Sequence, residues 1–171
     1  AQEALAASEA ELRAIFSAMD DLVLVLDQDG YYRKIAPTNI SLLAHPPEEL
    51  LQMNLTDVFP EKQAKEYKQI IKDCLQYDKT QSIGFSLMVK DTIKWFEATI
   101  SPMSADRVVW ITRDISERKL AEASIQLQSA ALNAAANAIQ ISNPDGEIVW
   151  VNPALTQLTG YEFHEAVGRK P

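Results

Sequence analysis

The most constraining feature of this sequence is a point where a strand passes directly into a long helix. Residues 108–112, Val-Val-Trp-Ile-Thr, are β-branched or aromatic, and the helical pattern that follows them continues to about Ile139. No Gly or Pro separates the two patterns. Asp114 or Ser116 can cap the new helix, because a short side-chain oxygen accepts from otherwise unpaired backbone N–H groups. The residues before this point are therefore expected to form one globular unit.

The order of elements in that unit predicts an α+β fold with a five-stranded antiparallel sheet. Short apolar or alternating runs predict strands, and Asp29-Gly30 marks the turn of a hairpin. Consecutive strands with short turns pair antiparallel, so the helices should cover one face of the sheet. The predicted strands are 22–26, 31–35, 82–90, 94–101 and 107–112. The predicted helices are 1–19, 40–44, 46–51 and 61–77, with a short connector at 54–60.

After the long helix, the chain repeats its own opening half. Aligning Gly30 with Gly146 gives an offset of 116 residues (146 − 30), which also pairs Pro37 with Pro153. The second copy lacks the long helix and the last three strands, so we expect it to be partly disordered or to borrow contacts. The sequence is interpreted as part of a longer protein. The predicted regions are an N-terminal signalling helix at 1–19, a complete domain at 20–113, a connector helix at 114–137 and a truncated second domain at 138–171.

Composition excludes several classes of function. The formal net charge of −8 argues against non-specific nucleic-acid binding and against anchoring to an anionic membrane. No apolar run approaches the ~18 to 20 residues of a membrane span. The single cysteine, Cys74, rules out a disulfide framework within the sequence. We therefore expect a cytoplasmic module with no nucleic-acid partner and no direct membrane contact.

The motifs resemble a pair of PAS domains joined by a signalling helix. Residues 114–118, Asp-Ile-Ser-Glu-Arg, resemble the Asp-Ile-Thr-Glu-Arg signature that closes many PAS domains, and residues 143–161 are similar to the opening half of the family. The resemblance implies a PAS fold that senses or dimerises upstream of a histidine kinase or, as the next expectation, a diguanylate cyclase. The first copy departs from the family pattern at Ala36, Ala44 and Gln52, where the second copy has Asn152, Gly160 and Gly168.

Haem, flavin and metal are not expected as cofactors. Haem-binding PAS domains generally use a histidine on the long helix, and neither His45 nor His164 lies there. Light-sensing PAS domains carry a cysteine just before that helix, whereas Cys74 lies well inside it and suits a small buried thiol. No residues show metal-ligand spacing or a nucleophile constellation. We therefore predict no catalytic residue and no enzymatic activity in this chain, while a small-molecule ligand is left open.

In a PAS fold, the resemblance places any ligand cavity between the sheet and the helices. Strand alternation turns either Trp95 or Phe96, with their alternate neighbours, toward the helices, and the Phe96 set is the more apolar. Alternation does not place Trp110. A buried Arg33 could bind a carboxylate, although a solvated edge position is the competing interpretation. The pocket candidates are Arg33, Phe59, Tyr67, Ile71, Phe85, Phe96 and Ala98; the alternative is that the aromatic residues among them simply fill a core.

The connector helix carries the strongest functional prediction. Leu120, Leu127 and Ala134 are seven residues apart, as are Ile125, Leu132 and Ile139, which favours a parallel helix pair between two chains. The competing interpretation is a helix that packs on its own domain. The expected relay residues are Asp114, Ile115 and Arg118, and the expected dimer-helix residues are Leu5, Leu12, Leu120, Leu127 and Leu132.

Three functional hypotheses follow from these observations. The first is a sensory and dimerisation module that passes its state through the connector helix. The second is a ligand-free structural spacer with the same fold, which a core without a cavity would support. The third is an enzyme on an α+β scaffold, which would need a polar cluster in a cleft.

Overall fold

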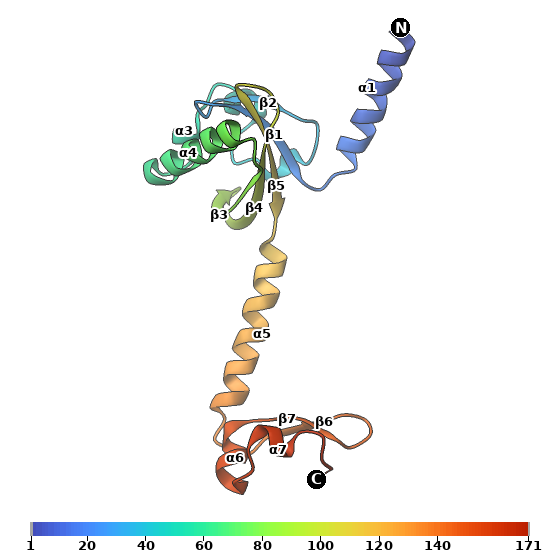
Figure 1. The fold of residues 1–171 in the computed structure, drawn as a ribbon, viewed down its shortest axis with the longest axis vertical. Coiled ribbons are helices and arrows are strands. Elements are labelled where there is room, and N and C mark those ends of the chain that lie inside the picture. The colour runs from blue at the N-terminus through green and yellow to red at the C-terminus, as the bar shows by residue number, and fades with distance from the viewer. Residues whose placement is uncertain (1, 171) are drawn as a thin grey trace. The chain divides into compact units, whose positions relative to one another are not determined.

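The computed structural model describes residues 2–170, apart from the side chains of residues 2–7, 9 and 13. The chain divides into two compact units whose boundary lies between Glu117 and Arg118. The first unit contains the complete α+β domain, and the second contains most of helix α5 together with a smaller α+β segment (Figure 1). Each unit is described by itself.

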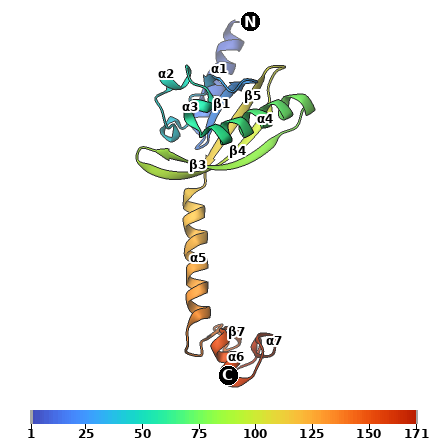
Figure 2. The same ribbon diagram turned by 90° about the vertical axis from the view of Figure 1, so that its left-hand side faces the viewer.

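The first unit is built on the predicted five-stranded antiparallel sheet, in the order β2-β1-β5-β4-β3 (Figure 1). Figure 2 shows strands β1, β3, β4 and β5 of this sheet in a second view. Terminal strands β1 and β5 are neighbours in the middle of the sheet, where Leu22 pairs with Thr112 and Asp27 with Arg107. The chain therefore enters and leaves the domain on adjacent strands, at the same end of the sheet. The strands are β1 Leu22–Asp27, β2 Tyr32–Ile35, β3 Gln81–Val89, β4 Thr92–Pro102 and β5 Arg107–Asp114.

Short helices and one long helix lie between the second and third strands. Helix α4 begins and ends as predicted, and its buried side chains include Tyr67, Ile71 and Cys74. Helix α3 was not predicted, because residues 54–60 were interpreted as a connector. Its start carries a reciprocal capping box between Asn54 and Asp57 that the sequence already showed. The helical elements are η1 Ile40–Leu42, α2 Pro47–Leu50, α3 Leu55–Val58 and α4 Glu61–Tyr77.

The core lies between the sheet and these helices. Phe96, Ala98 and Ile100 of β4 are fully or almost fully buried, so the more apolar of the two alternating sets faces inward as expected. Trp110 also faces inward and is 2% exposed. The rings of Phe59 and Phe85 meet edge to face at a centroid distance of 5.2 Å. A packed aromatic centre of this kind adds specific ring contacts to apolar burial.

Two helices flank the first domain in the sequence. Helix α1 spans Gln2–Ser17, and helix α5 spans Ser116–Ala134 (Figure 1). The predicted connector continued to residue 137, but the helix ends at Ala134. The reason lies in Asn152, whose amide binds the carbonyls of Leu132 and Ala135 and so takes the place of further helical bonds.

The second unit has regular structure after α5. Strands β6 Gln140–Ser142 and β7 Ile148–Val151 form an antiparallel pair, followed by helices α6 Pro153–Thr159 and α7 Phe163–Ala166. Ile148, Val151 and Ala166 form a small buried cluster. The hairpin turn repeats that of the first unit: Asp27 Oδ1 accepts from Asp29 N and Tyr31 N, and Asn143 Oδ1 accepts from Asp145 N and Glu147 N. The sequence repeat is thus a structural repeat.

Within the described residues, no helix is long and apolar enough to cross a membrane.

Candidate functional site

The strand-to-helix junction is held by the side chain of Asp114. One carboxylate oxygen, Oδ1, accepts from the backbone N–H of Ser116 at 2.9 Å, which is the first residue of α5. The other oxygen, Oδ2, accepts from Lys94 Nζ at 2.7 Å. Lys94 lies on β4, so one side chain connects a neighbouring strand to the first turn of the helix. Of the two predicted capping residues, Asp114 and Ser116, it is therefore Asp114 that caps α5.

Ser116 has a different role from the capping considered for it. Its hydroxyl accepts from the backbone N–H of Trp95 at 2.9 Å, and the N–H of Ile115 donates to the carbonyl of Trp95 at 2.8 Å. Ile115 is 9% exposed. The main chain between β5 and α5 is therefore fixed to β4 by two further hydrogen bonds beside those of Asp114.

The charge environment keeps Asp114 ionised. Burial opposes ionisation, but the hydrogen bonds from Lys94 and Ser116 outweigh it and hold the pKa of the Asp114 carboxyl below its ordinary value. Arg118, the third predicted relay residue, forms an ion pair with Glu122 one helical turn further on, at 3.8 Å.

A second ion pair connects the entry of the domain to its exit. Arg113 Nε and Nη2 donate to the two carboxylate oxygens of Asp21 at 3.0 and 2.8 Å. Asp21 precedes β1 and Arg113 lies near the end of β5, so the pair joins the segment after α1 to the segment before α5. Bidentate pairing fixes orientation as well as distance.

A small cavity lies inside the domain, between the sheet and the short helices. Its volume is about 40 Å³, and its lining side chains with polar groups are Tyr32, Trp110 and Thr112. Since one water needs about 10–15 Å³ in such a space, the cavity holds a few water-sized groups. The lining residues are Leu22, Leu24, Tyr32, Leu42, Leu43, Ala44, Leu50, Val58, Phe59, Phe85, Leu87, Phe96, Trp110 and Thr112.

Three of the seven predicted pocket residues line this cavity, namely Phe59, Phe85 and Phe96. Tyr67, Ile71 and Ala98 are buried in the same core but outside the lining. Sequence reasoning missed the contribution of β1 and of residues 42–50, because a continuous apolar strand does not reveal which side chain meets a void.

Arg33 also lies outside the cavity. Alternation on β2 turns Tyr32 inward, and Tyr32 is 4% exposed, whereas the Arg33 side chain is 48% exposed. The Arg33 guanidinium donates from Nε to Asp27 Oδ2 at 2.7 Å and lies over the ring of Tyr31. Its surroundings are those of the solvated edge position, with the hairpin turn as its anionic partner.

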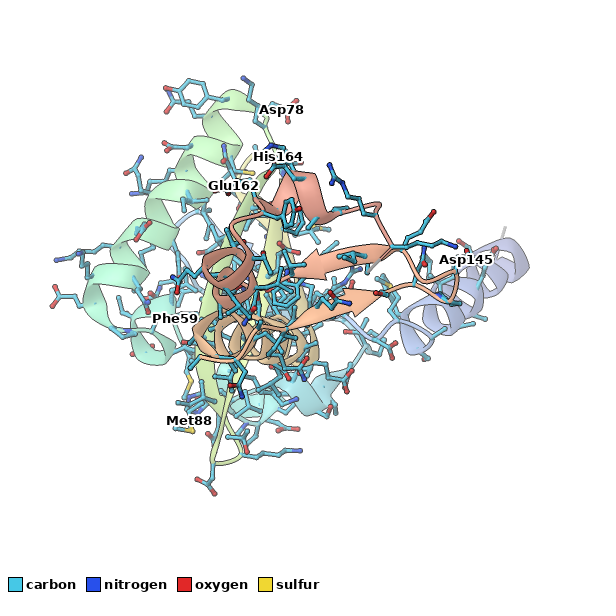
Figure 3. The ribbon with its side chains drawn as sticks, turned by 90° about the horizontal axis from the view of Figure 1, so that it is seen from below. Phe59, Asp78, Met88, Asp145, Glu162 and His164 are labelled. Atoms are coloured by element: carbon cyan, nitrogen blue, oxygen red, sulfur yellow. The ribbon has the colours of Figure 1, made fainter. Side chains whose placement is uncertain are left out.

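The residues weighed as cofactor ligands lie on different elements of the chain. Cys74 is fully buried, its Sγ lies 3.5 Å from the carbonyl of Ile100, and burial raises the pKa of the thiol. His45 precedes α2, and His164 lies in α7 (Figure 3). Among the described residues, no three Cys, His, Asp or Glu side chains gather as a metal site would require. The absence of a cofactor stays a prediction.

The predicted dimer residues on α5 are exposed in the single chain. Leu120 and Leu127 are 71% and 72% exposed, and none of the side chains of α5 is buried. Leu132 is half-buried near the end of the helix. On α1, Leu12 is exposed, and the side chain of Leu5 lies outside the described residues.

Comparison with known families identifies this architecture. The model of the family described as "PAS fold" matches residues 16–120, more than half of the chain. The chain belongs to the PAS family. A second family model, described as "PAS domain", matches residues 136–171, so the first PAS domain is followed by a segment of the same kind. No curated protein matches the chain.

Solved PAS structures share the fold at low sequence identity. A PAS domain of an HTR-like protein from Haloarcula marismortui is 19% identical with a TM-score of 0.55, covering 67% of this chain and 97% of its own. A domain of a sensory box sensor histidine kinase/response regulator from Geobacter sulfurreducens is 14% identical with a TM-score of 0.54, covering 64% and 96%. A PAS domain from Colwellia psychrerythraea is 16% identical with a TM-score of 0.53, covering 63% and 98%.

Family membership gives the module its broad class. PAS domains are sensory, non-catalytic modules of signalling proteins that commonly dimerise, in agreement with the interpretation of this chain as a signalling rather than an enzymatic unit.

Proposed function

We propose that the first PAS domain is a dimerising relay, which passes its conformational state through α5 to the second PAS segment and on to an output domain. The Asp114 junction is the observation that carries this proposal. Its bonds to Lys94 and Ser116 join β4 to the first turn of α5. A displacement of β4 against the core is therefore transferred to the helix rather than absorbed by a loose linker.

The exposed apolar surface of α5 supports pairing with a second copy of the chain. Full burial of a leucine side chain stabilises by about 1.5–3 kcal/mol, and Leu120 and Leu127 leave most of that gain unused in the single chain. A parallel helix pair places each leucine against its counterpart. The alanines of α5 at 130, 131 and 134 allow close approach but add little apolar area. The pair is therefore weak, and a weak pair can change register or rotate between two states.

The proposal extends to what lies beyond the described unit. The output domain is a histidine kinase, with a diguanylate cyclase as the next choice, and the module works in the cytoplasm without nucleic-acid or membrane partners. The domain of the Geobacter sulfurreducens sensor kinase shares only the fold. The expectation of a kinase therefore rests on the family resemblance of residues 114–118 and 143–161.

The small size of the cavity favours a second candidate function, in which the domain is a spacer without a bound ligand. Its volume of about 40 Å³ leaves room for only a few atoms, and its lining carries no charged side chain. This small, uncharged cavity supports the expectation that neither haem nor flavin is bound. A sensor of this geometry would bind a very small uncharged molecule, or would open its short helices to admit a larger apolar one.

Native mass spectrometry of the purified chain separates these functions. A dimer with extra mass supports the relay with a ligand sensor. A dimer of bare chains supports the relay as a ligand-free spacer. A bare monomer at protein concentrations up to about 1 mM, a dissociation constant that corresponds to only about 4 kcal/mol, contradicts pairing through α5.

A further inference from the structure

The buried side chain of Asn152 joins the end of α5 to the second PAS segment. It is 1% exposed, and its amide Nδ2 lies within hydrogen-bond distance of the carbonyls of Leu132, Ala135 and Asn137, at 3.2, 3.3 and 2.9 Å. These carbonyls belong to the last turn of α5 and the bend that follows. The side-chain oxygen Oδ1 accepts from two backbone N–H groups of the domain itself, those of Ile139 at 2.8 Å and Leu155 at 3.1 Å.

The donor half and the acceptor half of this amide therefore serve different elements. Carbonyls at a helix C-terminus have no partner within the helix and must be satisfied from outside. Nδ2 does this for α5, while Oδ1 caps α6 and fixes the residue that precedes β6. Because the side chain is buried, the bonds cannot be exchanged for water without opening the joint.

The first PAS domain has the same backbone at this place but a different side chain. Its equivalent residue, 116 positions earlier, is Ala36, and Ala36 N donates to Val23 O at 2.9 Å. In the second copy, Asn152 N donates to Ile139 O at 3.0 Å, which is the same bond. Alanine has no polar atom that can cap a helix.

Two neighbouring residues of the first domain, Thr38 and Asn39, make hydrogen bonds like some of those that Asn152 makes in the second copy. Thr38 Oγ1 accepts from Val23 N at 3.1 Å, as Asn152 Oδ1 accepts from Ile139 N in the second copy. Asn39 Nδ2 donates to Asp20 O at 3.2 Å, in the linker that follows α1. The acceptor role of Asn152 Oδ1 is thus kept by Thr38. The donor, Asn39 Nδ2, bonds to the linker after α1 and not to the helix itself.

We propose that Asn152 is a positioning residue that makes α5 and the second PAS segment one rigid piece, whereas the joint between α1 and the first domain, with Ala36 at the equivalent place, is compliant. The inference rests on the proposed relay through α5 for its functional meaning. A rotation of α5 then turns the second PAS segment by the same amount. A movement of α1 is instead partly taken up by bending at its joint, so the first PAS domain moves less. The two repeats share a fold but differ in how stiffly each is joined to the helix before it.

Hydrogen exchange followed by mass spectrometry tests the joint in the intact chain. In the wild type, amides of residues 130–137 should exchange at least about tenfold more slowly than those of residues 14–21, a factor equivalent to 1.4 kcal/mol. Asn152→Asp keeps an acceptor oxygen but loses the donor, so protection of residues 130–137 should fall by about tenfold. Protection of β7 should stay within about twofold if the second segment remains folded.

A transplant tests the same idea without weakening the second segment. Replacing Ala36, Thr38 and Asn39 by Asn, Ala and Leu gives the first domain the Asn-Pro-Ala-Leu sequence that residues 152–155 have in the second. Residues 14–21 should then become more protected, because the carbonyls of Phe16, Met19 and Asp21 are the counterparts of those that Asn152 binds. The control variant Thr38→Ala with Asn39→Leu, which keeps Ala36, should not gain this protection.

Equal exchange at the two joints in the wild type would overturn the proposal. So would unchanged protection in Asn152→Asp with β7 intact. If that variant unfolds the second segment, the transplant decides, and a transplant that gains no protection overturns the proposal. Failure of the proposed relay can be told apart from failure of this inference. If protection at the joint depends on Asn152 but α5 does not pair with a second copy, the inference holds and the proposed function is wrong.

Discussion

Replacing Asp114 by alanine removes a helix cap and an ion pair in one step. The cap is the bond from Ser116 N to Oδ1, and loss of such a bond costs about 0.5–2 kcal/mol. The ion pair with Lys94 is partly buried, with side chains 24% and 31% exposed, and adds up to about 1 kcal/mol. We expect Asp114→Ala to lower the free energy of unfolding of the first domain by about 1–3 kcal/mol.

Asp114→Asn separates the two contributions. The amide oxygen of asparagine still accepts from Ser116 N, because asparagine caps helices about as well as aspartate, but the charge that pairs with Lys94 is gone. This variant should therefore lose no more than about 1 kcal/mol. Urea titration followed by the NMR indole signal of Trp110, which is buried in this domain, reports its unfolding without contribution from the second unit.

The cost of Asp114→Asn relative to the wild type depends on pH in a defined direction. The pKa of Asp114 is lowered in the folded domain, so its ionised form stabilises the fold above the unfolded pKa of about 3.9. That stabilisation is lost as the pH falls through the folded pKa. The cost of Asp114→Asn should accordingly be full at pH 6 and shrink below about pH 4.

Two results would refute this reasoning about Asp114. One is an asparagine variant that is as unstable as the alanine variant, because the cap would then contribute nothing. The other is a cost of less than about 0.5 kcal/mol for alanine, the size of an ordinary surface substitution. For the relay itself, unaltered output from a longer signalling protein that carries Asp114→Ala would count against the junction as its transmission point.

The packing of the first domain gives further predictions. Gly30→Ala should destabilise by more than the ~1–2 kcal/mol of a left-handed alanine, since Gly30 has φ +84° and an added Cβ would lie 3.1 Å from buried Leu55. Gly146→Ala, with φ +82° and open space around it, should show the backbone strain alone. Equal losses of unfolding free energy in a urea titration of the two variants would contradict this difference. Phe85→Ala should cost about 3–5 kcal/mol, because Phe85 packs against four other aromatic rings, and a loss below ~1.5 kcal/mol would show that the cavity absorbs the change.

Much of the fold follows from local sequence patterns. Helix α4 has the predicted ends because its apolar face and the preceding Pro60 mark it clearly. The five strands lie within two residues of their predicted ends, and the antiparallel order follows from short turns. Helix α3 was missed because four residues are too few to show helical periodicity, although its capping box between Asn54 and Asp57 was present in the sequence.

The site was less accessible to sequence reasoning, because it depends on contacts between distant segments. Asp114 could be identified as a cap from its position, but Lys94, 20 residues earlier, could not be recognised as its partner. The same holds for Asp21 and Arg113, which are 92 positions apart. The end of α5 depends on Asn152, a residue beyond the helix that periodicity alone does not include.

Disulfide trapping on α5 tests the central claim of parallel pairing most directly. In a Cys74→Ser background, Leu127→Cys places a thiol on the apolar row, and Ser129→Cys places one about 200° away around the helix. We expect the Leu127 variant to form a covalent dimer under mild oxidation, while the Ser129 variant at equal concentration stays monomeric on a non-reducing gel. Equal trapping of both variants, or of neither, would contradict a parallel helix pair through this face of α5.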